Sequence, residues 1–404
     1  MIYRSFKVPF SHGRLKFTMF GSDRKMRFVA VLGVALTAIV CLQLMFGPAP
    51  ASVSEYSVRM SHRQPPLMNR CASCHQDVCE EFENSPHLST LIEASDPSIL
   101  ERFAGRSFQI VKDGPTIRFF DKDQQLWMNS DAYPEPMRIE WMFGSGQHAM
   151  TPVSLLSNPD GSTELIECSV SWFPPDVLGP TPGADLSGSR GVRCMGEPLD
   201  HARTMECFGC HVTQLPHEDG RIREESIIKG VSCDRCHPGG DEHIVAMEHG
   251  DKNAMEKWSN LSPLESINRC GECHRRADQL TKSELSPDRL VLIRFAPVGL
   301  AMSECFLKQD NSQSAEHPLR MDCLTCHDPH KPAEQSAEYY VAKCMECHSP
   351  KENHAAECTS PSTSNECLEC HMPTVTVAEN LRLTDHWIRI RKASDPPPAK
   401  STVP

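Results

Sequence analysis

Seven copies of the pattern Cys-X-X-Cys-His are the residues of this chain best suited to carry chemistry. They are CASCH at 71–75, CFGCH at 207–211, CDRCH at 233–237, CGECH at 270–274, CLTCH at 323–327, CMECH at 344–348 and CLECH at 367–371. Two cysteines three positions apart, followed at once by histidine, are typical of c-type haem attachment. The cysteines form two thioether bonds to the porphyrin, and the adjacent histidine is then placed beneath the iron as its proximal ligand.

The motifs therefore predict seven covalently attached c-type haems. Fourteen of the 20 cysteines would attach porphyrin: Cys71, Cys74, Cys207, Cys210, Cys233, Cys236, Cys270, Cys273, Cys323, Cys326, Cys344, Cys347, Cys367 and Cys370. The proximal iron ligands would be His75, His211, His237, His274, His327, His348 and His371.

Zinc and disulfide chemistry explain the motifs less well. A structural zinc site needs four ligands, normally from paired Cys-X-X-Cys knuckles at a regular separation, and the intervals between these motifs are irregular. A disulfide framework is compatible with export, but it gives no reason for a histidine after every second cysteine. Both alternatives are disfavoured.

The histidines outside the motifs are candidates for the second axial position of each iron. An electron-transfer haem favours a strong ligand on both sides, whereas a haem that binds substrate keeps one position open. His243, His330 and His386 are the first candidates, and Pro329 and the Pro-Gly-Gly after His237 are expected to direct His330 and His243 to neighbouring haems. His87, His148 and His354 form a second group. The sequence leaves the seventh position open among His217, His249, His317 and no ligand, with His201 as a spectator.

The composition agrees with a cofactor-filled interior. Hydrophobic residues make up 39% of the 404 residues, and without the cysteines about 34% remain, below the roughly 45–50% usual for globular chains. Each buried porphyrin would add several kcal/mol at about 25 cal/mol per Å². The 32 prolines and 22 glycines favour short elements with many irregular connections.

The first 51 residues carry a membrane-targeting signal. Seven basic residues and Asp23 precede or flank the apolar run at 28–46, whose 19 residues would span about 28 Å as a helix. The segment could be a cleaved signal peptide or an N-terminal anchor, and the sequence leaves both open. In either case residues 52 onward are expected on the periplasmic or exoplasmic side of a bacterial membrane.

Several segments resemble the exported multihaem cytochromes c related to the tetrahaem cytochromes of nitrifying bacteria and to penta- to octahaem cytochromes. They are CASCHQDVCEEFENSPH, VSCDRCHPGGDEHI, CGECHRR, DCLTCHDPH and CLECHMP followed by LTDHWIRI, within about residues 65–392. The resemblance implies stacked haems, iron ligation by the seven motif histidines, and distal roles for His87, His243, His330 and His386. GSGQHAM at 144–150 also resembles a segment of some members, which favours His148.

The chain departs from the catalytic members of these groups. It has no Cys-X-X-Cys-Lys motif, so the lysine-ligated haem of ammonia-forming nitrite reductases has no counterpart. It has five tyrosines, and no local pattern marks one as the haem crosslink of the hydroxylamine oxidoreductase group.

The predicted fold class is a mostly α or irregular multihaem cytochrome c fold, organised around stacked haems, with a small β-rich insert. The expected organisation is a targeting segment at 1–51, a linker and first haem segment at 52–105, a β-rich insert at 106–200, a six-haem array at 201–392 and a disordered tail at 393–404. Two hairpins are predicted in the insert, around 113–114 and 158–161, and the insert is expected to pack over the first haem.

Six cysteines lie outside the motifs. Cys41 belongs to the apolar run, where a buried thiol is expected. The other five, Cys79, Cys168, Cys194, Cys305 and Cys358, could pair in an oxidising compartment, although an odd number leaves at least one unpaired.

The leading functional prediction is an electron carrier that passes single electrons through seven haems, most with two histidine ligands. Its formal net charge of −12 predicts basic patches on redox partners such as other cytochromes, quinol-oxidising complexes or terminal reductases. Nothing indicates nucleic-acid binding, and the membrane is a partner only if residues 28–46 are retained. The alternative is a multihaem oxidoreductase that acts on a small nitrogen or sulfur compound at one open haem. A third possibility is a docking subunit for a catalytic partner.

Overall fold

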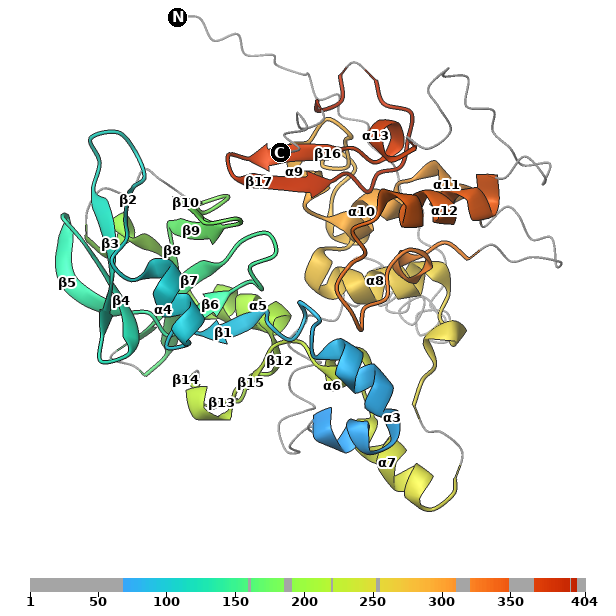
Figure 1. The fold of residues 1–404 in the computed structure, drawn as a ribbon, viewed down its shortest axis with the longest axis horizontal. Helices are drawn as coiled ribbons and strands as arrows, with labels where there is room; N and C mark the ends of the chain where they lie inside the picture. Colours follow the sequence, from blue (N-terminus) through green and yellow to red (C-terminus); the bar gives the residue numbers. More distant parts are fainter. Residues whose placement is uncertain are drawn as a thin grey trace, which may run out of the picture. The chain divides into compact units, whose positions relative to one another are not determined.

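Short strands and short helices follow one another along the chain in this computed structural model (Figure 1). The structure describes residues 68–158, 161–184, 191–218, 221–251, 255–309, 320–348, 367–392 and 394–397. The predicted targeting segment, most of the linker after it, and His354 lie outside these residues. Among the described helices, none combines the length and apolarity that crossing a bilayer requires.

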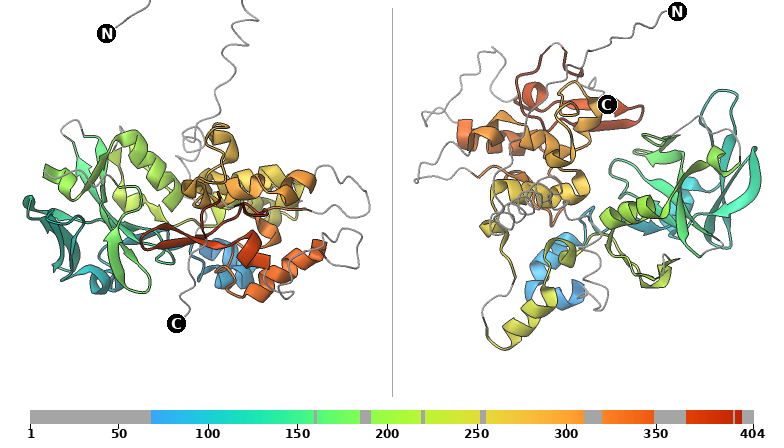
Figure 2. Two further views of the ribbon diagram at one scale, coloured as in Figure 1. Left: turned by 90° about the horizontal axis from the view of Figure 1, so that it is seen from above. Right: turned by 180° about the vertical axis from the view of Figure 1, so that it is seen from behind.

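Two antiparallel sheets occupy residues 91–199, and their course can be followed in Figures 1 and 2. The five-stranded sheet has the order β1 (Leu91–Glu93), β6 (Trp141–Phe143), β7 (Thr151–Ser157), β8 (Thr163–Cys168) and β11 (Gly196–Leu199). The four-stranded sheet has the order β2 (Ser107–Gln109), β3 (Thr116–Lys122), β4 (Gln125–Ser130) and β5 (Tyr133–Arg138).

Smaller strand pairs complete the β structure. They are β9 (Val170–Phe173) with β10 (Val177–Pro180), β12 (Val212–Gln214) with β15 (Ile228–Lys229), β13 (His217–Glu218) with β14 (Arg221–Ile222), and β16 (Thr374–Ala378) with β17 (Leu381–Thr384).

The described helices are short, and most of them follow the two large sheets in the sequence. They are α3 (Met68–Phe82), α4 (Pro97–Phe103), α5 (His201–His211), α6 (Cys233–Cys236), α7 (Gly240–Glu248), α8 (Pro263–His274), α9 (Leu290–Ile293), α10 (Ala296–Ala301), α11 (Glu304–Gln309), α12 (Ala337–His348) and α13 (Cys367–His371). The described residues also form five 3₁₀ turns: η1 (Gly191–Cys194), η2 (Glu224–Ser226), η3 (Trp258–Asn260), η4 (Ala277–Gln279) and η5 (Cys323–Thr325).

Local sequence explains where these elements begin and turn. Helix α8 starts with a capping box, in which Ser262 and Glu265 each bond the other's backbone N–H, and Pro263 occupies the first turn. Both predicted hairpins are present, as β2 with β3 and β7 with β8. A third, between β3 and β4, turns at Asp123 and Gln124, which both adopt positive φ. This turn lacks glycine, so it has no sequence signal of the kind that predicts a two-residue hairpin.

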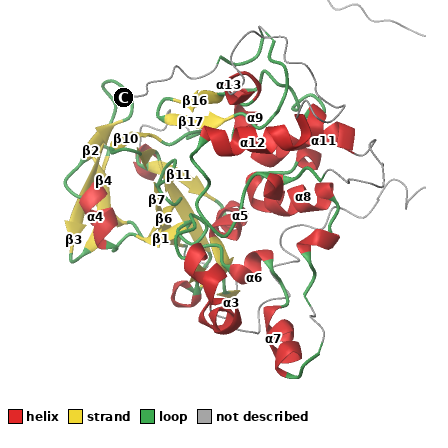
Figure 3. Cartoon of the chain, turned by 45° about the vertical axis from the view of Figure 1, so that its right-hand side comes forward, coloured by secondary structure: helices red, strands yellow, loops and turns green. Residues whose placement is uncertain are grey.

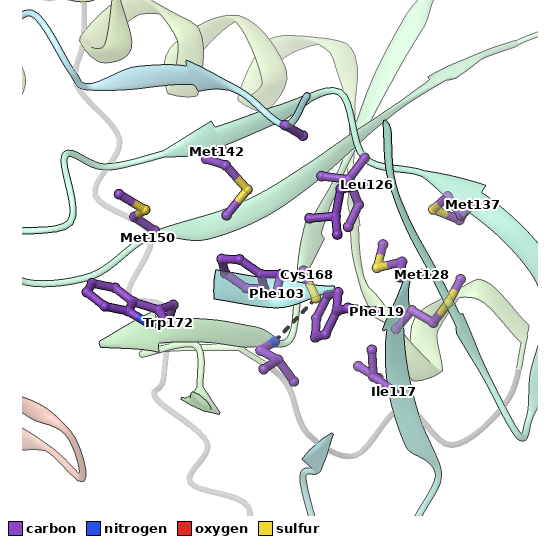
Figure 4. Close-up of a cluster of buried hydrophobic side chains, with 14 of the residues drawn as sticks. Phe103, Ile117, Phe119, Leu126, Met128, Met137, Met142, Met150, Cys168 and Trp172 are labelled. Atoms are coloured by element: carbon purple, nitrogen blue, oxygen red, sulfur yellow. Dashed lines mark hydrogen bonds between the residues drawn. The ribbon is translucent and has the colours of Figure 1, made fainter. Parts of the chain in front are cut away.

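The five-stranded sheet is buried on both faces because neighbouring residues of its strands belong to different cores. Met142 and Ile166 face a large cluster shared with the four-stranded sheet and α4, which includes Phe103 and Phe119 (Figure 4). Trp141, Phe143 and Leu165 face a second cluster that contains Phe208 of α5. Side chains on a strand alternate between faces, so each strand contributes to both clusters.

The helices that carry the later motifs have a much smaller side-chain core. The cluster beside α8, α10 and α11 contains four buried residues, Ile267, Leu300, Ala301 and Phe306. The large cluster of the β region contains 18. This contrast agrees with the composition argument that side chains alone give the motif-rich part a thin interior.

The predicted fold class is wrong in its balance of elements. The described residues are 37% helix and 25% strand, so the chain is not mostly helical, and Figure 3 shows the strands beside the helices. The many prolines had favoured irregular connections over regular strands. Pro134 and Pro136 nevertheless lie in β5, and Pro198 lies in β11, and each of these strands is at the edge of its sheet. An edge strand tolerates proline because one of its two sides has no neighbouring strand to which a backbone N–H would have to donate. Strand β1 and helix α4 both lie before residue 106, so the β region starts earlier in the sequence than the predicted insert.

The core of the β region generates a stability prediction. Phe119 is 1% exposed and packs edge-on against Phe103 with ring centroids 5.3 Å apart. Phe119→Ala should reduce the free energy of unfolding by about 3–5 kcal/mol. Phe120→Ala, one position along β3 on the opposite face and only half-buried, is the matched control and should cost about 1 kcal/mol. Denaturant unfolding followed by circular dichroism measures both, and equal losses would contradict this assignment of the core face.

Candidate haem sites

The described motifs share one local arrangement: a helical turn carries the cysteines and the regular helix stops at the histidine. Helices α5, α8, α12 and α13 end at His211, His274, His348 and His371. His75 interrupts α3 with φ −119° and ψ 45°. Helical spacing puts the two cysteines, three apart, on one face, and the break in the helix lets the histidine leave the helix direction.

Four motif histidines face a histidine from elsewhere in the chain. The ring centroids are 6.3 Å apart for His75 with His243, 6.3 Å for His87 with His274, 6.2 Å for His237 with His330, and 6.2 Å for His327 with His386. Each pair combines a predicted proximal ligand with a predicted distal ligand. The angle between the rings varies from 7° to 78°, so stacking does not explain the common separation.

The separation fits two imidazoles on opposite sides of one metal ion. A metal–imidazole bond is about 2.0–2.1 Å and a ring nitrogen lies about 1.1 Å from its centroid, so axial ligation predicts about 6.2–6.4 Å between centroids. Rotation about the metal–nitrogen bonds leaves this distance unchanged, which accounts for the free variation of the angle. The residues present therefore fit an iron held by paired histidines.

Several of these imidazoles are oriented by a hydrogen bond from the other ring nitrogen. Nδ1 of His386 lies 2.9 Å from the carbonyl oxygen of Thr384, and Nδ1 of His330 lies 3.0 Å from Oδ1 of Asp328. A carbonyl or carboxylate oxygen accepts, so Nδ1 carries the proton and Nε2 presents its lone pair. Metal-ligating histidines are commonly held in this way.

Burial favours the neutral form of five of the paired imidazoles, which is the form that binds a metal. Desolvation lowers the pKa of His274 to about 4. It also lowers the pKa of His87, His237, His327 and His386. At neutral pH a lone pair is therefore available at these positions.

The second motif is held by the β region. The ring of His211 stacks on Phe143 of β6, with centroids 4.5 Å apart and an interplanar angle of 15°. Its Nδ1 donates to the carbonyl oxygen of Thr90 at 2.8 Å, and Thr90 Oγ1 donates to the His211 carbonyl at 2.9 Å. One core cluster of the β region includes Phe208 of this second motif, and Cys207 packs against it. That the β region covers the first haem stays a prediction.

The other predicted ligands have no histidine ring partner within the described residues. His348 is exposed at the end of α12, and His148 lies on the loop after β6. Nδ1 of His371 donates to the Arg389 carbonyl oxygen at 3.2 Å. His354 and His317 lie outside the described residues. His201, His217 and His249 each approach a backbone carbonyl through Nδ1.

Cysteines of different motifs lie close together. The thiols of Cys71 and Cys233 are near enough to shift each other's pKa, as are those of Cys210 and Cys273 and those of Cys270 and Cys323. These pairs link the first motif to the third, the second to the fourth and the fourth to the fifth. A hydrogen bond of 2.9 Å, from Arg235 to the Gly209 carbonyl, joins the third motif to the second. Sequence spacing alone gave no sign of this order.

The cysteines outside the motifs are unpaired where the structure describes them. Cys79, Cys168, Cys194 and Cys305 are free thiols, and Cys358 lies outside the described residues. Cys168 and Cys194 belong to the same buried cluster. Burial raises the pKa of Cys168 to about 12, so its thiol is protonated.

The comparisons with known proteins concern one segment and one structure. Residues 189–238, which include the second and third motifs, match the family described as cytochrome c554 and c-prime. This segment is therefore cytochrome c-like, and haem c is the cofactor that the match implies. The crystal structure of the outer cell wall cytochrome OcwA is similar with a TM-score of 0.44 and 14% identity, over 80% of this chain and 78% of that chain. No curated protein sequence matches.

Proposed function

We propose that this chain is a c-type cytochrome that holds seven haems and passes single electrons through them outside the cytoplasm. The observation that carries the proposal is the set of four histidine pairs with ring centroids 6.2–6.3 Å apart. Four independent pairs at the spacing of axial ligation are not expected of histidines that serve only as core or surface residues. The match of residues 189–238 supports the same cofactor.

The chain's own residues would hold and tune the cofactors. The 14 motif cysteines would attach the porphyrins, and His243, His87, His330 and His386 would complete the coordination begun by His75, His274, His237 and His327. Each bound haem would supply a one-electron iron couple. Hydrogen bonds such as those of His386 and His330 would fix the imidazoles, so that little rearrangement accompanies the change of charge.

The closeness of the motifs supports transfer between neighbouring attachment sites. Thiols of motifs one and three, two and four, and four and five lie near enough to shift each other's pKa, and a hydrogen bond joins motifs three and two. Helices α12 and α13, which carry motifs six and seven, pack against each other. Close attachment sites favour rapid hopping between neighbouring macrocycles.

Redox proteins would be the partners. The formal net charge of −12 favours basic docking surfaces on other cytochromes, quinol-oxidising complexes or terminal reductases, and association should weaken as salt rises. The membrane would be a partner only if the segment at 28–46 is retained as an anchor.

Haem content tests the proposal directly. Pyridine haemochrome analysis and intact mass of the exported protein should both give seven covalently bound haems per chain. The double variant Cys344→Ser, Cys347→Ser should carry six. A wild-type mass equal to that of the bare polypeptide would reject the proposal.

The histidine pairs predict which substitutions open an iron. His243→Ala should convert one low-spin centre to high spin in the electron paramagnetic resonance spectrum, because His75 loses its facing imidazole. His201→Ala is the control and should leave the spectrum unchanged, because His201 is the predicted spectator at the start of α5 and its Nδ1 approaches the Thr163 carbonyl. Identical spectra for both variants would remove His243 as a ligand.

One observation favours the alternative of an oxidoreductase with an open haem. His211 is oriented by Phe143 and Thr90, yet within the described residues no histidine faces it at the axial distance. A small nitrogen or sulfur compound could bind at that position. Carbon monoxide titration separates the two functions: a gas adduct and a high-spin signal that responds to nitrite or hydroxylamine favour the enzyme, and the absence of both favours the carrier.

A further inference from the structure

Four charged side chains form a buried cluster after the last strand. Nη1 of Arg389 lies 2.9 Å from Oδ2 of Asp385, and its Nε lies 3.2 Å from Oδ2 of Asp395. Nη1 of Arg391 lies 2.9 Å from the same Asp385 oxygen. The arginine side chains are 12–13% exposed and the carboxylates 2–5%. Asp395 lies in the segment 393–404 that was predicted to be disordered, and the structure describes residues 394–397 of that segment.

A buried ion cluster of this kind is not explained by stability alone. Removing charges from water costs several kcal/mol for each ion, and well-packed apolar side chains of similar size often stabilise a fold as well or better. Buried ionic networks are better attested where a defined geometry is required. The contacts of the cluster identify what is held in place.

Arg389 connects two of the predicted iron ligands. Its guanidinium holds Asp385, the residue immediately before His386, and also donates to the Trp387 carbonyl at 2.7 Å. Its own carbonyl oxygen lies 3.2 Å from Nδ1 of His371. One residue thus orients the distal histidine of the fifth motif's pair and the proximal histidine of the seventh motif.

The segment around His386 is also fixed from the opposite side. Ser303 Oγ donates to the His386 carbonyl at 3.1 Å and accepts from the Ile388 N–H at 2.8 Å. Gly299 of α10 lies so close that a Cβ there would be 2.7 Å from the Trp387 nitrogen. The chain at 385–389 is therefore held between α10 and the charged cluster, with little room to move.

We infer that Arg389 is a positioning residue that sets the orientation of His386 and His371, and so tunes two of the seven haems together. This inference rests on the proposed function. Arg389 lies outside the seven Cys-X-X-Cys-His motifs. Loss of the guanidinium should perturb the fifth and seventh haems and leave the other five unchanged.

Arg389→Met is the test, with Arg382→Met on the exposed face of β17 as the matched control. The Arg389 variant should keep seven haems by pyridine haemochrome, while two of the seven transitions in a spectroelectrochemical redox titration shift and two low-spin resonance signals change. Arg389→Lys should shift them less, because it keeps the charge and loses the forked contact. The control should superimpose on the wild type.

The outcomes separate this inference from the function on which it rests. A wild-type protein without seven haems rejects the proposed function. Seven haems in both proteins with superimposable titrations and spectra reject the role of Arg389, even if the melting temperature falls. Should Arg389→Met fail to fold, Asp395→Asn removes one contact of the guanidinium, and unchanged spectra in that variant would equally reject the inference.

Discussion

Under the proposed function, the constraint on which the motif-rich part of this protein depends is that two imidazoles face each other across one metal ion. The requirement fixes the centroids near 6.3 Å and leaves the ring angle free, and the four pairs show this combination. It also makes distant segments meet. His87 faces His274 at the end of α8, and His386 faces His327. Histidines that are far apart in the sequence are therefore brought together.

The protein divides its stabilisation between two kinds of interior. In the β region, alternating side chains of the five-stranded sheet fill one cluster on each face, and a conventional apolar core results. Around α8, α10 and α11 the side-chain core is small. The two parts meet at the second motif, where Phe208 packs into the sheet and Phe143 stacks on His211. The β region is therefore a support for one attachment site as well as a core of its own.

Orientation of the ligands is supplied by polar groups outside the motifs. The backbone carbonyls of Thr90, Thr384 and Arg389 each accept a hydrogen bond from a histidine Nδ1. Around Arg389 this support extends to a buried ion cluster whose charges balance. Each predicted haem attachment uses five consecutive residues, whereas the orientation of the histidine rings depends on residues far away in the sequence.

The sequence by itself predicted the chemistry: it contains seven Cys-X-X-Cys-His motifs, from which haem c attachment and a shortlist of distal histidines follow as predictions, because attachment needs only residues adjacent along the chain. It also indicated both glycine-containing hairpins. Only the tertiary structure decided which histidines face one another, which motifs touch, and that strands with edge prolines make the β region large, because these depend on contacts between distant segments. The membrane segment and the role of His354 stay predictions from sequence. Arg389 could not be singled out in advance, since its contacts with Asp385, Asp395 and His371 exist only in the folded chain.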